Sequence, residues 1–310
     1  MADARWYSSM SCVKPLRAYW RNAARDGITF NANMSATKIP FGLPCGRCIG
    51  CRLEKARQWG LRCLHEKKMH STSCYLTLTY HNDYLPDGGT VVVRDMQLFF
   101  KRVHNRLLKR RGYGIRYFCG AEYGEDNGRP HYHALMFGYD FPDKVIHGRN
   151  ARGEPLFVSK ELSEVWFQGF STIGEITFDS AVYCAKYALK KVNGDARAAH
   201  YTVYDEDGVC YERVPEFAIM SRNPGIGASY YAKYGKEVRD HDSVIVNGRE
   251  VRPPRFYDTK SEFVDAESFA LMKKKRKRMA VLNRLDNTVE RLRVKEILMI
   301  RAAEKKERKL

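Results

Sequence analysis

The sequence predicts an α+β fold built on a central antiparallel sheet with helices on one face. Two apolar runs, residues 115–122 and 131–137, are joined by a turn-rich segment, which favours a β-hairpin. Two more strand-like runs, residues 74–80 and 169–176, are separated from this hairpin by helical patterns. The resulting order β-α-β-β-α-β, followed by one more helix, is typical of an α+β sheet.

Periodicity also predicts the helices. Residues 54–70 form a helix with a basic face, residues 96–110 form an amphipathic helix after the candidate cap Asp95, and residues 159–167 form a shorter helix. The basic residues of the first helix are Arg57, Arg62, Lys67 and Lys68. The second helix is expected to bury Met96, Phe99, Phe100, Val103 and Leu107.

Two histidines one residue apart, His131 and His133, lie in the strand that Pro130 and Gly138 bound. Alternate residues of a strand point to one face, so both imidazoles are expected on the sheet face opposite the helices. Such a pair suits a divalent metal, and Glu122 at the end of the preceding strand is the best candidate for a third ligand. For an isolated pair, half-buried histidines without a metal are the commoner interpretation. The tyrosines downstream favour the metal.

Those tyrosines occupy a predicted helix over residues 181–191, capped by Asp179 or Ser180, that would lie across the histidine face. Helical spacing places four side chains on one face: Tyr183, Lys186, Tyr187 and Lys190. The opposite face would pack on the sheet through Val182, Ala185 and Leu189. Lysine charge stabilises a phenolate and the phosphate that it attacks, which makes the tyrosines candidate nucleophiles. An amphipathic helix whose tyrosines cover the edge of the core is the alternative.

Three motifs, in this order along the chain, resemble those of HUH rolling-circle replication initiators. The motifs are Tyr75-Leu76-Thr77-Leu78-Thr79-Tyr80, then Gly128-Arg129-Pro130-His131-Tyr132-His133, then Tyr183-x-x-Lys186-Tyr187-x-x-Lys190. In particular, the chain resembles the replication initiation proteins of gokushovirus-type microviruses, which are small single-stranded DNA phages. Further matching stretches are residues 43–54, 57–59 and 220–227. The resemblance extends over roughly residues 12–258.

The resemblance implies an HUH endonuclease fold with a ferredoxin- or RRM-like sheet. It also implies an enzyme that nicks single-stranded origin DNA with Mg²⁺ or Mn²⁺, forms a 5′-phosphotyrosyl intermediate and rejoins the ends to release circles. The position of Glu122 matches a usual third metal ligand of the family. Host helicase, polymerase and single-strand-binding protein would act as partners, since the sequence has no G-x-x-x-x-G-K-[ST] motif.

The composition is compatible with that function. The net charge of +18 favours a polyanionic partner, and 19 tyrosines and 15 phenylalanines offer rings for base stacking. Candidate DNA-contacting residues are Arg129 and the run Lys273, Lys274, Lys275, Arg276, Lys277 and Arg278. A solvated basic helix explains the run equally well. The sequence has no apolar stretch long enough to span a bilayer, and residues 1–10 lack a signal core. We therefore expect no membrane partner and a location in the cytoplasm, which the resemblance implies is that of a bacterial host cell.

The nine cysteines suggest reduced thiols and metal rather than disulfides. Cys45, Cys48 and Cys51 have the spacing of zinc ligands, and Cys12 is the preferred fourth ligand, with Cys63 or His65 as alternatives. A structural Zn²⁺ would fold a segment too short for a core of its own. Three unligated cysteines in a loop, or an iron–sulfur cluster, are the competing interpretations.

Composition, together with what the resemblance implies for the core, divides the chain into four segments. Residues 1–70 form a cysteine-rich module, residues 71–193 the endonuclease core, residues 194–260 an accessory segment with a shaped turn at 221–227, and residues 261–310 a basic helical tail. Heptad spacing in the tail covers only Leu282, Leu285, Val289 and Leu292, too little for a coiled coil. The alternatives to a replication initiator are a relaxase or HUH transposase, a non-enzymatic zinc-dependent DNA-binding protein, and a basic nucleocapsid-like protein.

Overall fold

The computed structural model describes residues 11–108, 114–124, 127–187, 192 and 194–307. Its contacts divide the chain into two compact units. The sheet unit comprises Ala56–Ser261, and the terminal unit combines Met1–Lys55 with Glu262–Lys309. The four segments inferred from composition remain an interpretation of the sequence.

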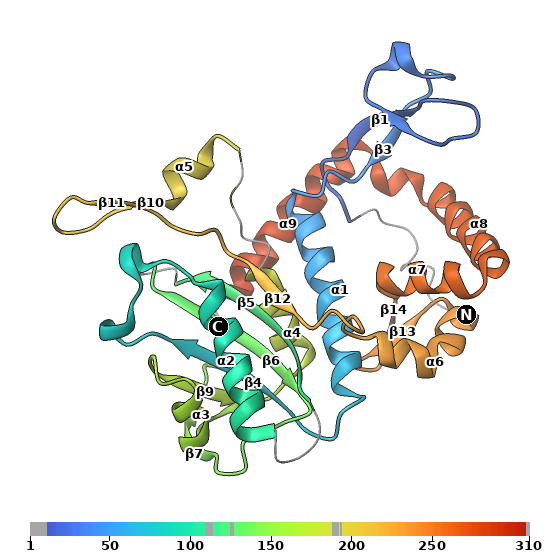
Figure 1. The fold of residues 1–310 in the computed structure, drawn as a ribbon. Helices are drawn as coiled ribbons and strands as arrows, with labels where there is room; N and C mark the ends of the chain where they lie inside the picture. Colours follow the sequence, from blue (N-terminus) through green and yellow to red (C-terminus); the bar gives the residue numbers. More distant parts are fainter. Residues whose placement is uncertain (1–10, 109–113, 125–126, 188–191, 193, 308–310) are drawn as a thin grey trace. The chain divides into compact units, whose positions relative to one another are not determined.

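A seven-stranded antiparallel sheet forms the centre of the sheet unit (Figure 1). Its strand order is β12-β5-β6-β4-β9-β8-β7. The strand bounds are β4 Ser73–Thr79, β5 Arg116–Tyr123, β6 Pro130–Phe137, β7 Val145–Arg149, β8 Pro155–Val158, β9 Ser171–Gly174 and β12 Ala218–Met220. The predicted α+β class with an antiparallel sheet is therefore confirmed.

The four predicted strands are present as β4, β5, β6 and β9, and three short outer strands add to them. β7 and β8 form a hairpin at one edge, and β12 pairs with β5 at the other edge. The sequence of β7 lacks the alternation of apolar and polar residues that marks a half-buried strand, because most of β7 is exposed.

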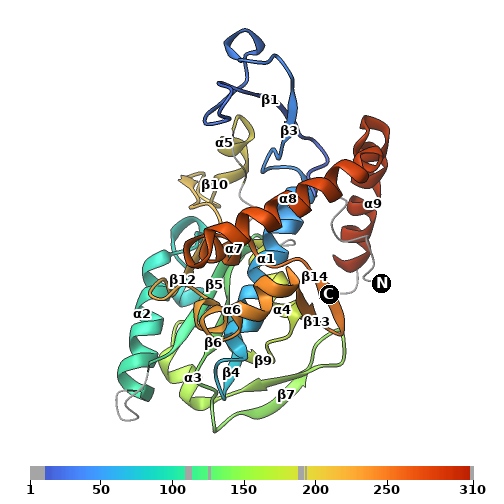
Figure 2. The ribbon, with the colours of Figure 1, turned by 90° about the vertical axis from the view of Figure 1, so that its right-hand side faces the viewer.

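Helices cover both faces of the sheet (Figure 1 and Figure 2). The expectation that all helices except the tyrosine helix lie on one face is therefore wrong. On one face, α2 (Val93–Val103) and α3 (Lys160–Val165) bury Met96, Phe99, Leu162 and Trp166 against the sheet. On the other face lie α4 (Phe178–Tyr187) and α1 (Ile49–Lys67), with the part of α1 from Ala56 onward in the sheet unit. The helix expected at residues 54–70 thus packs beside the tyrosine helix.

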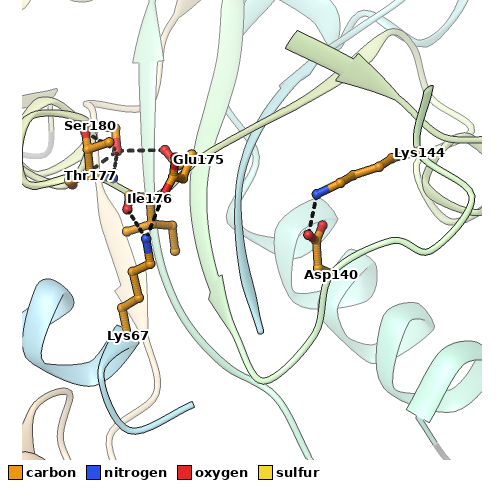
Figure 3. Close-up of polar contacts among 7 residues, drawn as sticks. All are labelled: Lys67, Asp140, Lys144, Glu175, Ile176, Thr177 and Ser180. Atoms are coloured by element: carbon orange, nitrogen blue, oxygen red, sulfur yellow. Dashed lines mark hydrogen bonds and ion pairs between the residues drawn. The ribbon is translucent and has the colours of Figure 1, made fainter. Parts of the chain in front are cut away.

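The cap residues differ from those predicted. Thr177 precedes α4, and its Oγ1 accepts a hydrogen bond from Ser180 N, while Ser180 Oγ accepts one from Thr177 N (Figure 3). This reciprocal pair replaces a cap at Asp179 or Ser180. Lys67 of α1 donates to the carbonyl of Ile176 at 2.6 Å, which anchors the start of α4 (Figure 3).

The second predicted cap is also wrong. α2 begins at Val93, so Asp95 lies within its first turn, where its carboxylate accepts a 2.6 Å hydrogen bond from the Tyr80 hydroxyl. α2 continues into a π-helical turn, His104–Leu108.

Residues after α4 complete the sheet unit. They form α5 Ala196–Tyr201, β10 Thr202–Tyr204, β11 Cys210–Glu212, α6 Ala228–His241, β13 Val244–Val246, β14 Arg249–Val251 and the start of α7 Arg255–Val264. The turn expected at residues 221–227 is present with a cis Asn223–Pro224 bond. The buried Glu66 carboxylate accepts a hydrogen bond from Gly227 N at 2.6 Å and holds the end of this turn.

The terminal unit joins the two ends of the chain. β1 Leu16–Trp20 pairs with β2 Ile28–Thr29 and with β3 Phe41–Leu43. The basic tail contains two helices, α8 Ala266–Leu282 and α9 Val289–Glu307, with a 3₁₀ turn over Arg284–Asn287 between them. Met299 of α9 packs with the cysteine-rich segment, and Lys14 forms a 2.8 Å ion pair with Glu296.

Candidate metal centre and tyrosine helix

The hairpin β5–β6 brings Glu122, His131 and His133 together. Glu122 is directly opposite His131 in the strand register, and the spacing of two places both imidazoles on the same face. Glu122 Oε1 lies 2.7 Å from His131 Nε2 and 2.9 Å from His133 Nε2. One ligand atom from each residue falls within 4.8 Å of the others, as a shared metal ion requires.

The hydrogen bonds behind these atoms suit a cation. His131 Nδ1 lies 3.1 Å from the carbonyl oxygen of Arg129, which can only accept, so Nδ1 carries a proton. In a neutral ring, Nε2 then directs a lone pair at the Glu122 carboxylate, so two hydrogen-bond acceptors face each other without a proton between them. A second ring proton on Nε2, or a cation between the two atoms, removes this repulsion. A cation would also satisfy Glu122 Oε2, which is buried without a hydrogen-bond partner among the described residues.

His133 is oriented from behind as well. Its Nδ1 lies 2.7 Å from the Tyr75 hydroxyl and 3.2 Å from Thr77 Oγ1, both on β4. Such outer contacts fix the ring plane and direct Nε2 toward a ligand position. Burial raises the pKa of the Glu122 carboxyl, but its interactions with the His131 and His133 rings in their protonated form outweigh burial, so this pKa is lowered. The donor set of two imidazoles and one carboxylate fits a divalent ion.

The helix α4 lies directly beside this group. The ring centroids of Tyr183 and His133 are 5.3 Å apart in an edge-to-face arrangement. Ala181, Cys184 and Ala185 face the core, so Cys184 and Ala181 take the role that was expected of Val182, which is only half-buried. Lys186 is half-buried.

Other predicted members of the tyrosine face are only partly described. Tyr187 is the last described residue of α4, and its side chain lies outside the described part of the structure. Leu189 and Lys190 also lie outside the described residues.

Two glycines allow the close approach of α4, and no sequence pattern singled them out. A Cβ atom on Gly120, the residue opposite His133, would lie 2.9 Å from the Cys184 carbonyl oxygen. A Cβ atom on Gly60 of α1 would lie 2.5 Å from Val182 Cγ2. Cys184 Sγ also donates to the carbonyl of His133 at 3.2 Å. Backbone contact therefore sets the position of Tyr183 relative to the histidines.

Gly120→Ala should displace α4 from the sheet. Overpacking of this kind typically costs about 1–3 kcal/mol in the free energy of unfolding. If Tyr183 acts on a substrate at the histidines, a displacement near 1 Å should also slow that reaction by about 100-fold. Chemical denaturation and a cleavage assay measure the two effects. Gly114→Ala is the matched control because its Cβ atom would meet nothing within 4 Å. Equal behaviour of the two variants would contradict this account of the packing.

A second cluster lies in the terminal unit. The sulfur atoms of Cys12, Cys45, Cys48 and Cys51 all lie within 4.8 Å of one another. Cys12 Sγ is 3.7 Å from Cys45 Sγ and 3.8 Å from Cys48 Sγ. Four thiolates at the usual zinc–sulfur distance form a tetrahedron with edges of about 3.8 Å, so the spacing fits zinc.

Hydrogen bonds favour a thiolate at one residue of this cluster. Burial opposes ionisation of Cys48, but backbone N–H groups of Cys51 and Val13 lower its pKa to about 6. Burial raises the pKa of Cys12 and of Cys51, so these two thiols would ionise on binding a cation. The alternatives for the fourth ligand, Cys63 and His65, lie in the sheet unit, fully buried.

The predicted DNA-contacting residues are placed as follows. Lys273, Lys274, Lys275, Lys277 and Arg278 are exposed on α8, and Arg276 is half-buried. Lys273 forms a 2.9 Å ion pair with Glu262. Arg129 donates to Tyr80 O at 2.6 Å and to Asn82 Oδ1 at 2.8 Å, so it holds the chain that follows β4. Contact of these residues with DNA remains a prediction.

The fold and the centre define an α+β protein with candidate metal ligands beside a tyrosine-bearing helix. Residues 73–192 match the family described as replication-associated protein ORF2. The chain is 31% identical over 253 residues to replication-associated protein VP4 of Bdellovibrio phage phiMH2K, covering 80% of this chain and 76% of that protein. It is 30% identical over 291 residues to replication-associated protein ORF2 of Spiroplasma virus 4, covering 87% of each.

A third relative is replication-associated protein ORF4 of Chlamydia phage 1, 24% identical over 227 residues, or 71% of this chain and 53% of that protein. No solved structure matches the chain. The chain belongs to the family of phage replication-associated proteins, which confirms the resemblance to phage replication initiators. Among the described residues, no helix is both long and apolar enough to cross a membrane.

Proposed function

We propose that this protein is an HUH endonuclease that initiates rolling-circle replication by nicking single-stranded origin DNA inside the bacterial host cell. One observation carries the proposal: Glu122, His131 and His133 converge on the sheet face where α4 presents Tyr183. The core order β4-α2-β5-β6-α3-β9 supports the HUH assignment, because its strands are arranged β5-β6-β4-β9, as in ferredoxin-like folds.

Each residue group has a distinct role in this proposal. Glu122, His131 and His133 would hold Mg²⁺ or Mn²⁺, which supplies Lewis-acid polarisation of the scissile phosphate. The Tyr183 or Tyr187 oxygen bonds to phosphorus while the bond from phosphorus to the 3′ oxygen breaks. The phenol loses the proton that the leaving 3′ hydroxyl gains. Lys186 and Lys190 would stabilise the phenolate and the phosphate charge.

The products account for replication without a nucleotide cofactor. The free 3′ hydroxyl primes synthesis by a host polymerase, with host helicase and single-strand-binding protein opening and covering the strands. The 5′-phosphotyrosyl bond conserves the energy of the phosphodiester, so rejoining to release a circle needs no ATP. The family favours this substrate over that of a relaxase or a transposase.

The decisive test is adduct formation. Incubation with a single-stranded origin oligonucleotide and Mn²⁺ should give a covalent protein–DNA species that survives denaturing electrophoresis. Peptide mapping should locate the DNA on residues of α4. Tight binding without any adduct would instead support a non-enzymatic zinc-dependent DNA-binding protein.

We further propose that the four clustered cysteines bind one structural Zn²⁺ per chain. Elemental analysis should find one zinc, and Cys45→Ser or Cys48→Ser should lower the content well below one. Because Met299 packs with the cluster, zinc removal should speed tryptic cleavage in α9. Cys210→Ser, at an exposed cysteine outside the cluster, is the matched control. A zinc-free protein with unchanged protease resistance would contradict the proposal.

A further inference from the structure

We propose that three exposed rings on the sheet unit, Tyr84, Phe167 and Phe170, form a stacking strip for the bases of single-stranded DNA next to the metal centre. The inference rests on the proposed function and specifies how the substrate strand is held. It starts from the register of the sheet.

One row of paired residues runs from the metal centre to Phe170. Glu122 pairs with His131, His131 pairs with Thr79, and Thr79 N donates to Phe170 O at 2.9 Å. Residues that pair across antiparallel strands project to the same face. Phe170 therefore lies on the face of Glu122 and the histidines, two strands or about 10 Å from His131.

The strip is exposed although neighbouring rings fill the core. Phe170, Phe167 and Tyr84 are 54%, 53% and 49% exposed, whereas the adjacent Trp166 is completely buried. Tyr84 and Phe167 meet edge to face with centroids 5.7 Å apart. The Phe170 ring lies 5.6 Å from that of His147. Contiguous exposed apolar patches on a soluble protein commonly mark sites of interaction.

The backbone beneath the rings is closely held. Gly169 separates Phe167 from Phe170, and a Cβ atom there would lie 2.1 Å from the Thr79 carbonyl oxygen. His81 N donates to Gln168 O at 2.9 Å, which continues the pairing beyond β4. The rings therefore project from a preformed edge, which lowers the entropy lost on binding.

Charge on this edge favours a nucleic acid over an apolar protein partner. The Arg102 guanidinium, on α2, lies 5.0 Å from the centroid of the Phe167 ring. Phe167 therefore lies on the side of the strand ends where α2 packs, and a bound strand would pass over these ends from Phe167 and Tyr84 to Phe170 on the histidine face. Arg129 is fixed beside the strip through Tyr80 O and Asn82. The carboxylate of Asp83 opposes these charges, but it lies 3.2 Å from the His81 imidazole. Rings beside guanidinium groups match a strand of stacked bases and phosphates.

Affinity for a labelled single-stranded oligonucleotide, measured without added Mg²⁺ or Mn²⁺, tests the strip. Tyr84→Leu, Phe167→Leu and Phe170→Leu should each weaken binding by about fivefold to 150-fold, since each stacked base contributes about 1–3 kcal/mol. The salt dependence should keep its slope because no phosphate contact is removed. Tyr204→Leu, which removes a ring of 70% exposure from β10, is the matched control and should bind as the parent does.

A measurement on the unaltered protein avoids any folding defect of the variants. Oligonucleotides carrying 5-iodouracil near the cleavage position should photo-crosslink to the strip residues. Unchanged affinity of all three variants, an equal loss in the Tyr204 variant, or crosslinks only elsewhere would overturn the strip. These outcomes can be distinguished from failure of the proposed function. If the protein forms covalent adducts but the three ring variants bind DNA with unchanged affinity, only the strip is refuted. If the ring variants lose affinity but the protein forms no adduct, the proposed nuclease activity is refuted.

Discussion

His131→Ala and His133→Ala should each reduce strand cleavage by more than about 100-fold while leaving DNA affinity nearly unchanged. Loss of residues that only orient a metal ligand already costs about 10–100-fold, so loss of a ligand should cost more. Affinity should persist because it comes mainly from backbone charge, and the chain carries a net charge of +18. Cleavage of a labelled single-stranded origin oligonucleotide and its binding isotherm give the two readouts.

Two further variants sharpen this test. Glu122→Gln keeps the shape of the side chain but removes the charge that a cation needs, so it should also lose cleavage. His104→Ala removes an exposed histidine from the turn after α2 and should cleave normally. Raising the Mn²⁺ concentration should rescue a weakened site more readily than an absent one. Undiminished cleavage by either histidine variant would exclude this centre from the mechanism.

Local patterns anticipated much of the centre. The spacing of His131 and His133 correctly predicts a shared face, because strand alternation is fixed by the backbone. The turn-rich segment before Pro130 correctly predicts that Glu122 lies beside the histidines on the neighbouring strand, and the structure places it opposite His131. Cys12 joins the other three cysteines, as preferred, although the roles of all these residues remain predictions.

Contacts between distant segments could not be predicted in this way. The pairing of β12 with β5 and the packing of α1 beside α4 depend on tertiary contacts that no local period encodes. Gly60 and Gly120 resemble ordinary glycines until the helix that crosses them is known. Apolar periodicity would likewise assign Phe167 and Phe170 to the core, although both are exposed. Helix caps fail for a simpler reason, since Thr177 and Ser180 are both good capping residues a single turn apart.

Tyr183→Phe and Tyr187→Phe should each retain single-turnover adduct formation, and the double variant should form none. A terminating initiator has to cut the regenerated origin while its first tyrosine still carries the old 5′ end. Residues at i and i+4 of a helix have Cβ atoms about 6 Å apart, so either phenol could reach a phosphate held at one centre. The contact of the Tyr183 ring with His133 places this tyrosine at that centre.

The consequence is a difference between one cycle and many. If the tyrosines alternate as nucleophiles, each single variant should stop after its first strand transfer and release no unit-length circles over repeated rounds. Adduct yield on a short oligonucleotide reports the first step, and circle release from a plasmid origin reports turnover. Tyr234→Phe, on α6 of the sheet unit, controls for loss of a tyrosine elsewhere. A single variant that is already inactive in cleavage, paired with another that replicates fully, would contradict alternation. One tyrosine would then be the sole nucleophile, and the lysine-flanked partner would serve to bind phosphate or pack the helix.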